Sequence, residues 1–302
     1  MSRLETVLAG VKLKNPVMNA SGTAGFGPEM AKNFDLNQLG AFVIKSTTLK
    51  PKAGHPWPVT AETKGGWLNA VGLKNPGIEH VLANELPWLA QNYPNLPIVG
   101  SVAGESLEEY VKVAKKMATA PNVKFIEVNI SCPNVKKGGL TFGTDPEVVE
   151  ELTREIKSVV LDKPVFMKLT PGVTDVVEIA KAAERGGADG LVMINTLMGM
   201  EIDLATRKPH LSNGTGGLSG EALHPIALRM IHQVRQVSNL PIVGVGGVFD
   251  AKDALELMFA GAQAVQVGAA SYGDPKACVK IIDGLEPAMD KYDFNAISDF
   301  MI

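Results

Sequence analysis

The chain has 302 residues, of which 45% are hydrophobic and 20% are charged, a composition typical of globular proteins. Its net charge of −3 gives no support for binding to nucleic acid or to an anionic membrane surface. Two cysteines are too few for a disulfide framework, an internal iron–sulfur cluster or a Cys₄ zinc site, so redox chemistry would need an organic cofactor.

The start of the chain shows no apolar signal segment, and no apolar run approaches the roughly 20 residues that span a bilayer. We therefore expect a cytoplasmic protein with no membrane contact. The five histidines show no metal-binding spacing, so no metal site is predicted.

Short runs rich in Val and Ile alternate with helical patterns along the whole chain, which predicts parallel strands joined by helices. Eight such units fit a (β/α)₈ TIM barrel formed as a single domain over residues 1–302, and the alternative is an open doubly wound sheet. The predicted strands are Pro16–Gly22, Ala41–Thr47, Pro97–Ala103, Lys124–Ser131, Pro164–Thr170, Gly190–Thr196, Pro241–Val248 and Ala264–Ala269.

Helix signals lie between these strands. Ser106 opens a capping box before a run to about Ala120, and a helix that begins near Asp175 should stop at Gly186-Gly187. Aspartates are expected to cap three further helices, at Asp145-Pro146, at Asp250 before Ala251–Ala260, and at Asp274-Pro275.

Two connections, Lys50–Gly77 and Leu197–His224, are too long for simple loops. Both follow strands, so we expect them to be insertions at the C-terminal face, where barrels keep their active sites.

Polar residues recur where the predicted strands end, on the expected active-site face. They are Ser21, Lys45, Ser46, Asn129, Ser131, Cys132, Lys168, Thr170, Asn195 and Thr196. A lysine in an apolar strand is costly unless a counter-charge or a ligand compensates it. One such lysine could form a structural ion pair, but two at equivalent strand ends favour a binding site.

Glycines end the last two strands, at Gly244-Val-Gly246-Gly247 and at Gly268. The loops after strands seven and eight of a barrel often hold a phosphate on backbone N–H groups. The run Gly216-Gly217-Leu-Ser219-Gly220 could close over the same ligand or could be an ordinary flexible loop.

The two cysteines differ in context. Cys278 lies in a helical pattern and is predicted to be a small buried core residue. Cys132 lies at a strand end before the segment Lys136-Lys137-Gly138-Gly139, a setting that suits a reactive thiol. Position alone leaves open whether that thiol acts as a base or as a nucleophile.

The motifs Asn129-Ile-Ser-Cys-Pro-Asn134, Asn69-Ala-Val-Gly-Leu73, Asn195-Thr196, Thr206-Arg-Lys-Pro and Gly216-Gly-Leu-Ser-Gly220 resemble those of the class 1 dihydroorotate dehydrogenases in order and spacing. The segment after the cysteine, Lys136 to Gly139, looks like the NAD-linked type 1B catalytic subunit.

The resemblance implies oxidation of dihydroorotate to orotate in pyrimidine (UMP) biosynthesis, with hydride transfer to N5 of FMN and Cys132 as the general base. The implied FMN contacts are Ser21, Lys45, Ser46, Ser101, Asn129, Lys168, Ile194, Gly220, Gly246, Gly247, Gly268 and Ala269. The implied substrate contacts are Lys45, Asn69, Ala70, Val71, Gly72, Leu73, Asn129, Asn134, Asn195 and Thr196.

Two positions depart from the family pattern. Ser101 stands where Asn is expected, and Ala269 stands where Thr is frequent, so both put details of the FMN contacts in doubt.

No dinucleotide-binding glycine fingerprint follows an N-terminal strand. An NAD-linked enzyme would therefore pass electrons through another protein. The resemblance implies a homodimeric core with a partner subunit that carries FAD and a [2Fe–2S] cluster, a heterotetramer overall.

Several alternatives stay open. They are a fumarate-linked type 1A enzyme acting alone, another FMN barrel such as a dihydropyrimidine-type reductase or a tRNA dihydrouridine synthase, a phosphate-sugar isomerase, and a non-catalytic binding barrel.

Overall fold

The computed structural model describes residues 2–130, 136–137 and 140–300. At its centre lies an eight-stranded parallel sheet with the strand order β3-β18-β17-β12-β11-β8-β7-β4. A parallel bridge between Met18 and Ala41 joins the two ends of this order, so the sheet closes on itself. The predicted (β/α)₈ barrel is confirmed, and the open sheet is excluded.

All eight predicted strands are present, although each is shorter than its predicted range. The barrel strands are β3 (Val17–Asn19), β4 (Phe42–Val43), β7 (Ile98–Val102), β8 (Val123–Asn129), β11 (Val165–Lys168), β12 (Gly190–Met193), β17 (Ile242–Val245) and β18 (Ala264–Val267).

The barrel interior is filled in layers, because alternate residues of a strand face the same side. Its apolar layer includes Val43, Val99, Phe125, Phe166 and Val243, which belong to one buried cluster. The rings of Phe125 and Phe166 meet edge to face at 5.7 Å. The next inward position along each strand is therefore one layer closer to the C-terminal face.

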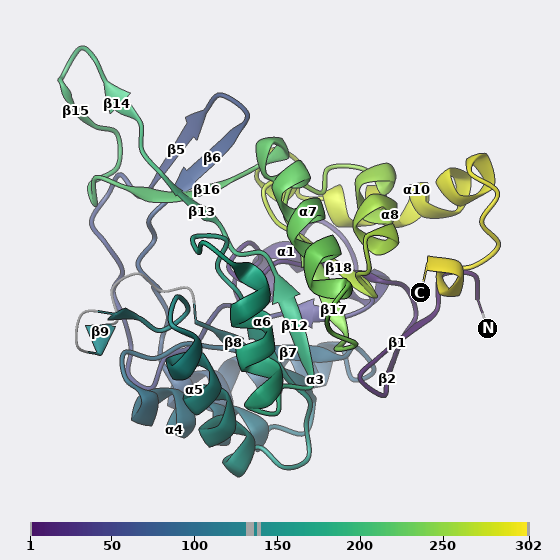
Figure 1. The fold of residues 1–302 in the computed structure, drawn as a ribbon, viewed down its shortest axis with the longest axis horizontal. Helices are drawn as coiled ribbons and strands as arrows, with labels where there is room; N and C mark the ends of the chain where they lie inside the picture. Colours follow the sequence, from purple (N-terminus) through teal and green to yellow (C-terminus); the bar gives the residue numbers. More distant parts are fainter. Residues whose placement is uncertain (1, 131–135, 138–139, 301–302) are drawn as a thin grey trace.

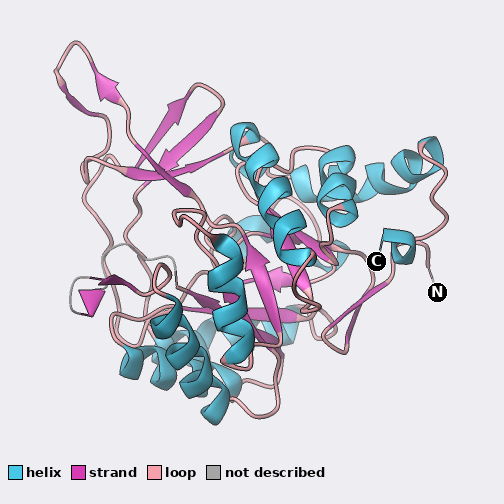
Figure 2. Ribbon diagram, in the orientation of Figure 1, coloured by secondary structure: helices cyan, strands magenta, loops and turns pink. Residues whose placement is uncertain are grey.

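Helices cover the outside of the barrel (Figure 2). A second and larger apolar cluster lies between them and the strands. The helices are α1 (Pro28–Ala31), α2 (Ile78–His80), α3 (Leu86–Asn92), α4 (Leu107–Ala118), α5 (Pro146–Val159), α6 (Val176–Arg185), α7 (His224–Arg235), α8 (Ala251–Phe259), α9 (Ala270–Gly273) and α10 (Ala277–Lys291).

Four of the five predicted helix starts are confirmed by side-chain caps. Ser106, Asp145, Asp175 and Asp250 each accept a hydrogen bond from a backbone N–H in the first turn of α4, α5, α6 and α8. The predicted start at Asp274-Pro275 is wrong. Asp274 accepts from the backbone N–H of Lys276 at 2.9 Å, which closes a turn before the helix, and α10 begins at Ala277.

The two long connections form a second sheet over the barrel (Figure 1). Its strand order is β13-β16-β6-β5, and all its pairs are antiparallel. The strands are β5 (Thr60–Thr63), β6 (Gly66–Asn69), β13 (Leu197–Gly199) and β16 (Gly216–Ser219). Beyond it projects a two-stranded arm made by β14 (Ile202–Asp203) and β15 (Lys208–Pro209).

The opposite end of the barrel is closed by a hairpin of β1 (Thr6–Leu8) and β2 (Val11–Leu13), whose Leu8 and Leu13 join the interior cluster. The remaining elements are β9 (Lys136–Lys137), β10 (Leu140–Thr141) and the short helical turns η1 (Leu36–Gln38), η2 (Val81–Glu85), η3 (Glu221–Leu223) and η4 (Ile297–Phe300).

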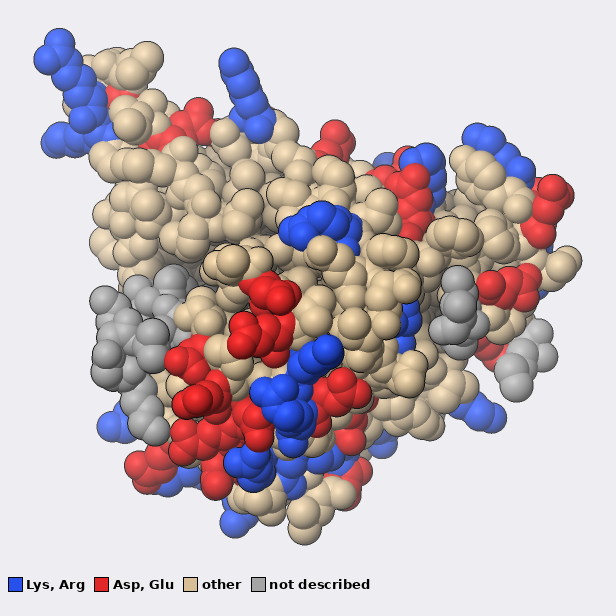
Figure 3. Space-filling view, in the orientation of Figure 1, with Lys and Arg blue, Asp and Glu red and all other residues tan. Residues whose placement is uncertain are grey.

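The surface over α4, α5 and α6 carries acidic and basic side chains intermixed, whereas that over the four-stranded sheet is largely uncharged (Figure 3). Among the described residues, no helix has both the length and the apolar character needed to cross a membrane.

Candidate active site

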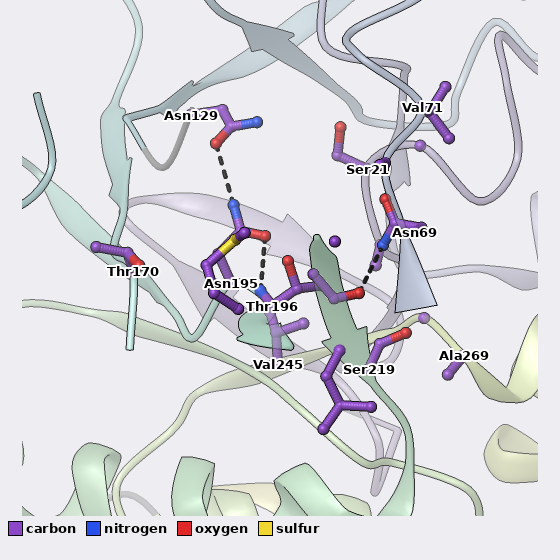
Figure 4. Close-up of a pocket in the computed structure, with 18 of the residues that line it drawn as sticks. Ser21, Asn69, Val71, Asn129, Thr170, Asn195, Thr196, Ser219, Val245 and Ala269 are labelled. Atoms are coloured by element: carbon purple, nitrogen blue, oxygen red, sulfur yellow. Dashed lines mark hydrogen bonds between the residues drawn. The ribbon is translucent and has the colours of Figure 1, made fainter. Parts of the chain in front are cut away.

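A cavity of about 420 Å³ lies at the C-terminal ends of the barrel strands, beneath β6 and β16 (Figure 4). That volume is in the range of small-molecule sites, about 300–1,000 Å³. The predicted site residues that line it are Ser21, Lys45, Ser46, Asn69, Ala70, Val71, Gly72, Leu73, Asn129, Lys168, Ile194, Asn195, Thr196, Gly220, Gly246, Gly247, Gly268 and Ala269.

Three predicted residues are not in this set. Cys132 and Asn134 lie outside the described residues. Ser101 is fully buried beneath the cavity floor, where its hydroxyl lies 2.8 Å from that of Ser46 and 3.1 Å from that of Ser21. Ser101 therefore supports two lining residues from below.

Amide side chains line the cavity, with Asn129 and Asn195 next to each other and Asn69 apart from them (Figure 4). Asn195 donates from Nδ2 to Oδ1 of Asn129 at 3.1 Å, and its own Oδ1 accepts from the backbone N–H of Thr196 at 2.8 Å. Asn69 donates to the carbonyl of Gly217 at 3.2 Å. These bonds fix the direction of each amide, and an amide offers both a donor and an acceptor.

The loop from Asn69 to Leu73 folds around His55, which the sequence analysis did not single out. The ring Nδ1 of His55 lies 2.9 Å from the carbonyl oxygen of Ala70, and its backbone N–H donates to Val71 at 3.1 Å. Gly72 has a φ of 75°, and a Cβ there would lie 2.9 Å from the ring of His55. Only glycine permits this close approach.

Glycines that follow β17 and β18 form a cradle at the cavity. Gly246 and Gly247 have φ values of 137° and 65°, and a Cβ on either would lie 2.7 Å from α7, at Ala227 and His224 respectively. A Cβ on Gly268 would meet only Ala20, at 3.6 Å. The first two glycines thus let α7 pack closely behind the loop, and all three line the cavity at the loops after strands seven and eight, where barrels often bind phosphate.

His224, the first residue of α7, packs against the glycine cradle on the side away from the cavity. Its Nδ1 lies 3.3 Å from the carbonyl of Gly246, and its Nε2 lies 3.0 Å from Oε2 of Glu256. The ligand atoms of His224, Asp253 and Glu256 lie within 4.8 Å of one another. However, the carboxylate of Asp253 accepts from the backbone N–H groups of Phe249 and Asp250, and Glu256 pairs with Lys252, so these groups are engaged within the protein.

Lys45 reaches the cavity past Gly22, where a Cβ would lie 2.9 Å from the lysine Nζ. Burial lowers the pKa of Lys45, and the positive charge of Lys168 lowers it further. Both effects disfavour a cation at this place in the ligand-free protein, so an anion bound here would gain from meeting Lys45.

A buried polar layer, which the sequence analysis missed in part, lies directly beneath the cavity floor. Ser101, Glu127, Lys168 and Gln266 each lie two residues after a member of the apolar interior layer. Lys168 Nζ lies 3.5 Å from Oε1 of Glu127 and 3.1 Å from Oε1 of Gln266. The ion-pair alternative for a strand-end lysine is therefore realised at Lys168, which also lines the cavity.

Glu127 and Gln266 could have been found from the sequence. Glu127 interrupts the apolar run Phe125–Val128 two residues before Asn129, so it shares the face of Asn129. Gln266 interrupts Ala264–Val267 in the same way. Tyr272 was also missed: it lines the cavity, and its ring packs edge to face against Trp67 at 5.9 Å.

The fold and this site define an enzyme built on a β/α barrel, whose cavity is lined by a glycine cradle and two lysines. A sequence model of the family described as dihydroorotate dehydrogenase matches residues 3–289. The chain belongs to the dihydroorotate dehydrogenase family.

Similar proteins carry two kinds of name. A protein of Pediococcus pentosaceus, provisionally named dihydroorotate dehydrogenase A (fumarate), is 79% identical over 99% of both chains. The dihydroorotate dehydrogenase A (fumarate) of Lactiplantibacillus plantarum is 66% identical over 98% of this chain and 97% of its own. The catalytic subunit of dihydroorotate dehydrogenase B (NAD(+)) from Anoxybacillus flavithermus is 56% identical over 99% of this chain and 95% of its own.

Proposed function

We propose that this chain oxidises dihydroorotate to orotate in pyrimidine biosynthesis, with FMN as its bound cofactor and Cys132 as its general base. The observation that carries the proposal is that one cavity is lined by a glycine cradle, two lysines and a set of oriented amides. Family membership supports the reaction, and the cavity supports the assignment of residues to it.

The described residues fit FMN. Its phosphate would be held by the backbone of Gly246, Gly247, Gly268 and Ala269, where a bare main chain faces the cavity. Lys45 and Lys168 would meet the negative charge of the reduced ring system. Bound FMN supplies the two-electron acceptor that no side chain of the protein provides.

The substrate would be held by the amides. Asn69, Asn129 and Asn195 present donors and acceptors to the edges of a planar pyrimidine, and Thr196 adds a hydroxyl. Lys45 would neutralise the carboxylate, and the backbone of the Asn69–Leu73 loop would close the pocket. Asn134 is expected to join this set.

Cys132 would remove the C5 proton of dihydroorotate while hydride leaves C6. The ordinary thiol pKa is about 8.5, so we expect the rate of flavin reduction to rise from neutral to mildly alkaline pH. Replacing Cys132 with alanine should slow flavin reduction by dihydroorotate at pH 8 by about 10²–10⁴-fold, the usual contribution of a general base.

The matched control is Cys278→Ala, because Cys278 is fully buried in α10. Stopped-flow absorbance of the flavin under anaerobic conditions measures both variants. Near-normal reduction in Cys132→Ala, with FMN bound, would exclude the thiol as the base.

The electron acceptor has two candidates. The names of the relatives at 79% and 66% identity favour fumarate, taken up by this chain without another subunit. The segment Lys136 to Gly139 and the name of the relative at 56% identity favour NAD, reached through an FAD and [2Fe–2S] subunit bound to a homodimeric core. We place fumarate first because its relatives are the more similar of the two groups.

One experiment separates the two acceptors. The purified chain is reduced with dihydroorotate without oxygen, and fumarate or NAD is then added. Reoxidation of the flavin by fumarate supports the first candidate. Failure with both acceptors, together with co-purification of an iron–sulfur flavoprotein from the native host, supports the second.

A further inference from the structure

The buried carboxylate of Glu127 lies under the cavity floor. Glu127 is 0% exposed, and Gln266 is 1% exposed. Both face the barrel interior from β8 and β18, one layer above the apolar side chains of Phe125 and Ala264. A carboxylate at this depth is retained only when charges and hydrogen bonds compensate it.

The compensation comes from three strands. Gln266 donates from Nε2 to Oε2 of Glu127 at 2.7 Å, and Ser101 donates its hydroxyl to Oε1 at 3.2 Å. Lys168 lies 3.5 Å from the same Oε1 and donates to Oε1 of Gln266 at 3.1 Å. The ammonium group of Lys168 therefore lies close to both the carboxylate of Glu127 and the side-chain amide oxygen of Gln266.

The same network reaches the cavity lining. Ser101 lies within hydrogen-bond distance of the hydroxyls of Ser46 and Ser21, and Asn129 donates to Ser46 at 3.4 Å. Glu127 is thus linked through Ser101 to Ser21 and Ser46, and through Ser46 to Asn129, although Glu127 does not line the cavity itself.

Among the described residues, the charged groups at and beneath the cavity floor are two lysines and one glutamate. Lys45 and Lys168 bring two positive charges to the floor, and Glu127 brings one negative charge beneath them. In a buried site with a low effective dielectric, one added or removed charge changes the stability of any nearby anion strongly.

We propose that Glu127 is a positioning residue that holds the ammonium group of Lys168 at the cavity floor and limits the positive charge there, and so sets the reduction potential of the bound flavin. This inference rests on the proposed binding of FMN. An uncharged residue at position 127 would leave the floor more positive, which favours the anionic reduced flavin.

The test measures the midpoint potential of bound FMN by equilibration with reference dyes at pH 6.5. Glu127→Gln keeps the shape and removes the charge. We expect the ratio of reduced to oxidised flavin at a fixed ambient potential to rise at least about tenfold, which is about 30 mV for a two-electron couple. Glu127→Asp keeps the charge and should stay near the wild-type potential.

Glu127→Met is the second variant, for the case in which Glu127→Gln does not fold. It removes the same charge with little change of volume, so the potential should shift in the same direction as in Glu127→Gln. Thr153→Val, a buried change in α5 where the hydroxyl donates only locally to Val149, controls for general destabilisation and should leave the potential unchanged.

Every outcome of these measurements either supports or overturns the role proposed for Glu127. Raised potentials in Glu127→Gln and Glu127→Met, with Glu127→Asp near the wild-type value, support the inference. Unshifted potentials, or equal shifts in Glu127→Gln and Glu127→Asp, overturn it. Loss of FMN from folded Glu127→Gln and Glu127→Met would also overturn it, because Glu127 would then serve binding and not the potential. If the wild-type protein binds no FMN, it is the proposed function that fails.

Discussion

Two glycines of the cradle differ in why the residue must be glycine. We expect Gly246 to be required for the stability of the fold and Gly268 to be required for FMN binding, and alanine substitutions test this difference. Gly246 has a φ of 137°, and its added Cβ would lie 2.7 Å from the Cβ of Ala227 in α7. Such a backbone conformation costs a residue with a side chain about 1–3 kcal/mol. Forcing an extra methyl group into a packed contact costs about 1–3 kcal/mol more.

Gly246→Ala should therefore lower the free energy of unfolding of the FMN-free protein by about 2–6 kcal/mol. Gly268→Ala is the matched change. Its φ is not in the left-handed region, and its Cβ would meet only Ala20 at 3.6 Å, an ordinary contact. Its stability should stay within about 0.5 kcal/mol of wild type, while the new methyl group beside the cavity weakens FMN binding.

Urea unfolding of both FMN-free variants gives the two free energies, and fluorescence titration with FMN gives the two affinities. A loss of less than about 1 kcal/mol in the free energy of unfolding of Gly246→Ala would show that neither backbone strain nor steric overlap acts at this position. The expected difference between the two positions is also refuted if Gly268→Ala is destabilised as much as Gly246→Ala, because the cradle would then be a packing feature throughout.

Two further predictions concern groups whose pKa values the fold changes. Burial and the charge of Lys168 lower the pKa of Lys45, so charged Lys45 destabilises the FMN-free protein below its folded pKa, and this penalty disappears as pH rises toward the ordinary lysine value. Lys45→Met should raise the free energy of unfolding of the FMN-free protein by about 0.5–2 kcal/mol at pH 7, and by less in alkaline buffer. Thermal unfolding at the two pH values measures both differences. Stability equal to or lower than that of the wild type at pH 7 would contradict this prediction. Burial raises the pKa of Cys278 to about 12, so Cys278→Ser should not change the number of thiols labelled quickly at pH 8, and a lost fast-reacting thiol would contradict this.

The helix starts could be predicted because capping is local. Ser106, Asp145 and Asp250 each accept a hydrogen bond from a backbone N–H two or three residues further along the chain. Both partners of each cap are therefore close together in the sequence. The start at Asp274-Pro275 was predicted wrongly for the same reason. An aspartate that closes a turn and one that caps a helix have the same sequence pattern, and only the following backbone separates them.

The barrel and most of the cavity lining could also be predicted, because parallel strands bring their C-terminal ends to one face. Lys45 and Lys168 come together there from strands 123 positions apart, and the alternation of strand and helix was enough to predict it. The contacts of His55 with Ala70 and Gly72 could not be predicted, because they depend on how one long connection folds back on itself.

The sequence by itself determined the barrel, the strand-end polar residues, the glycine cradle and the resemblance to one family, since each is written in local pattern and order. Only the tertiary structure decided that β6 and β16 pair to cover the cavity, and that Glu127, Gln266 and Lys168 form one buried network. The physical reason is that these contacts join strands from distant parts of the chain. Periodicity gives the face of each residue but not its partner across the barrel.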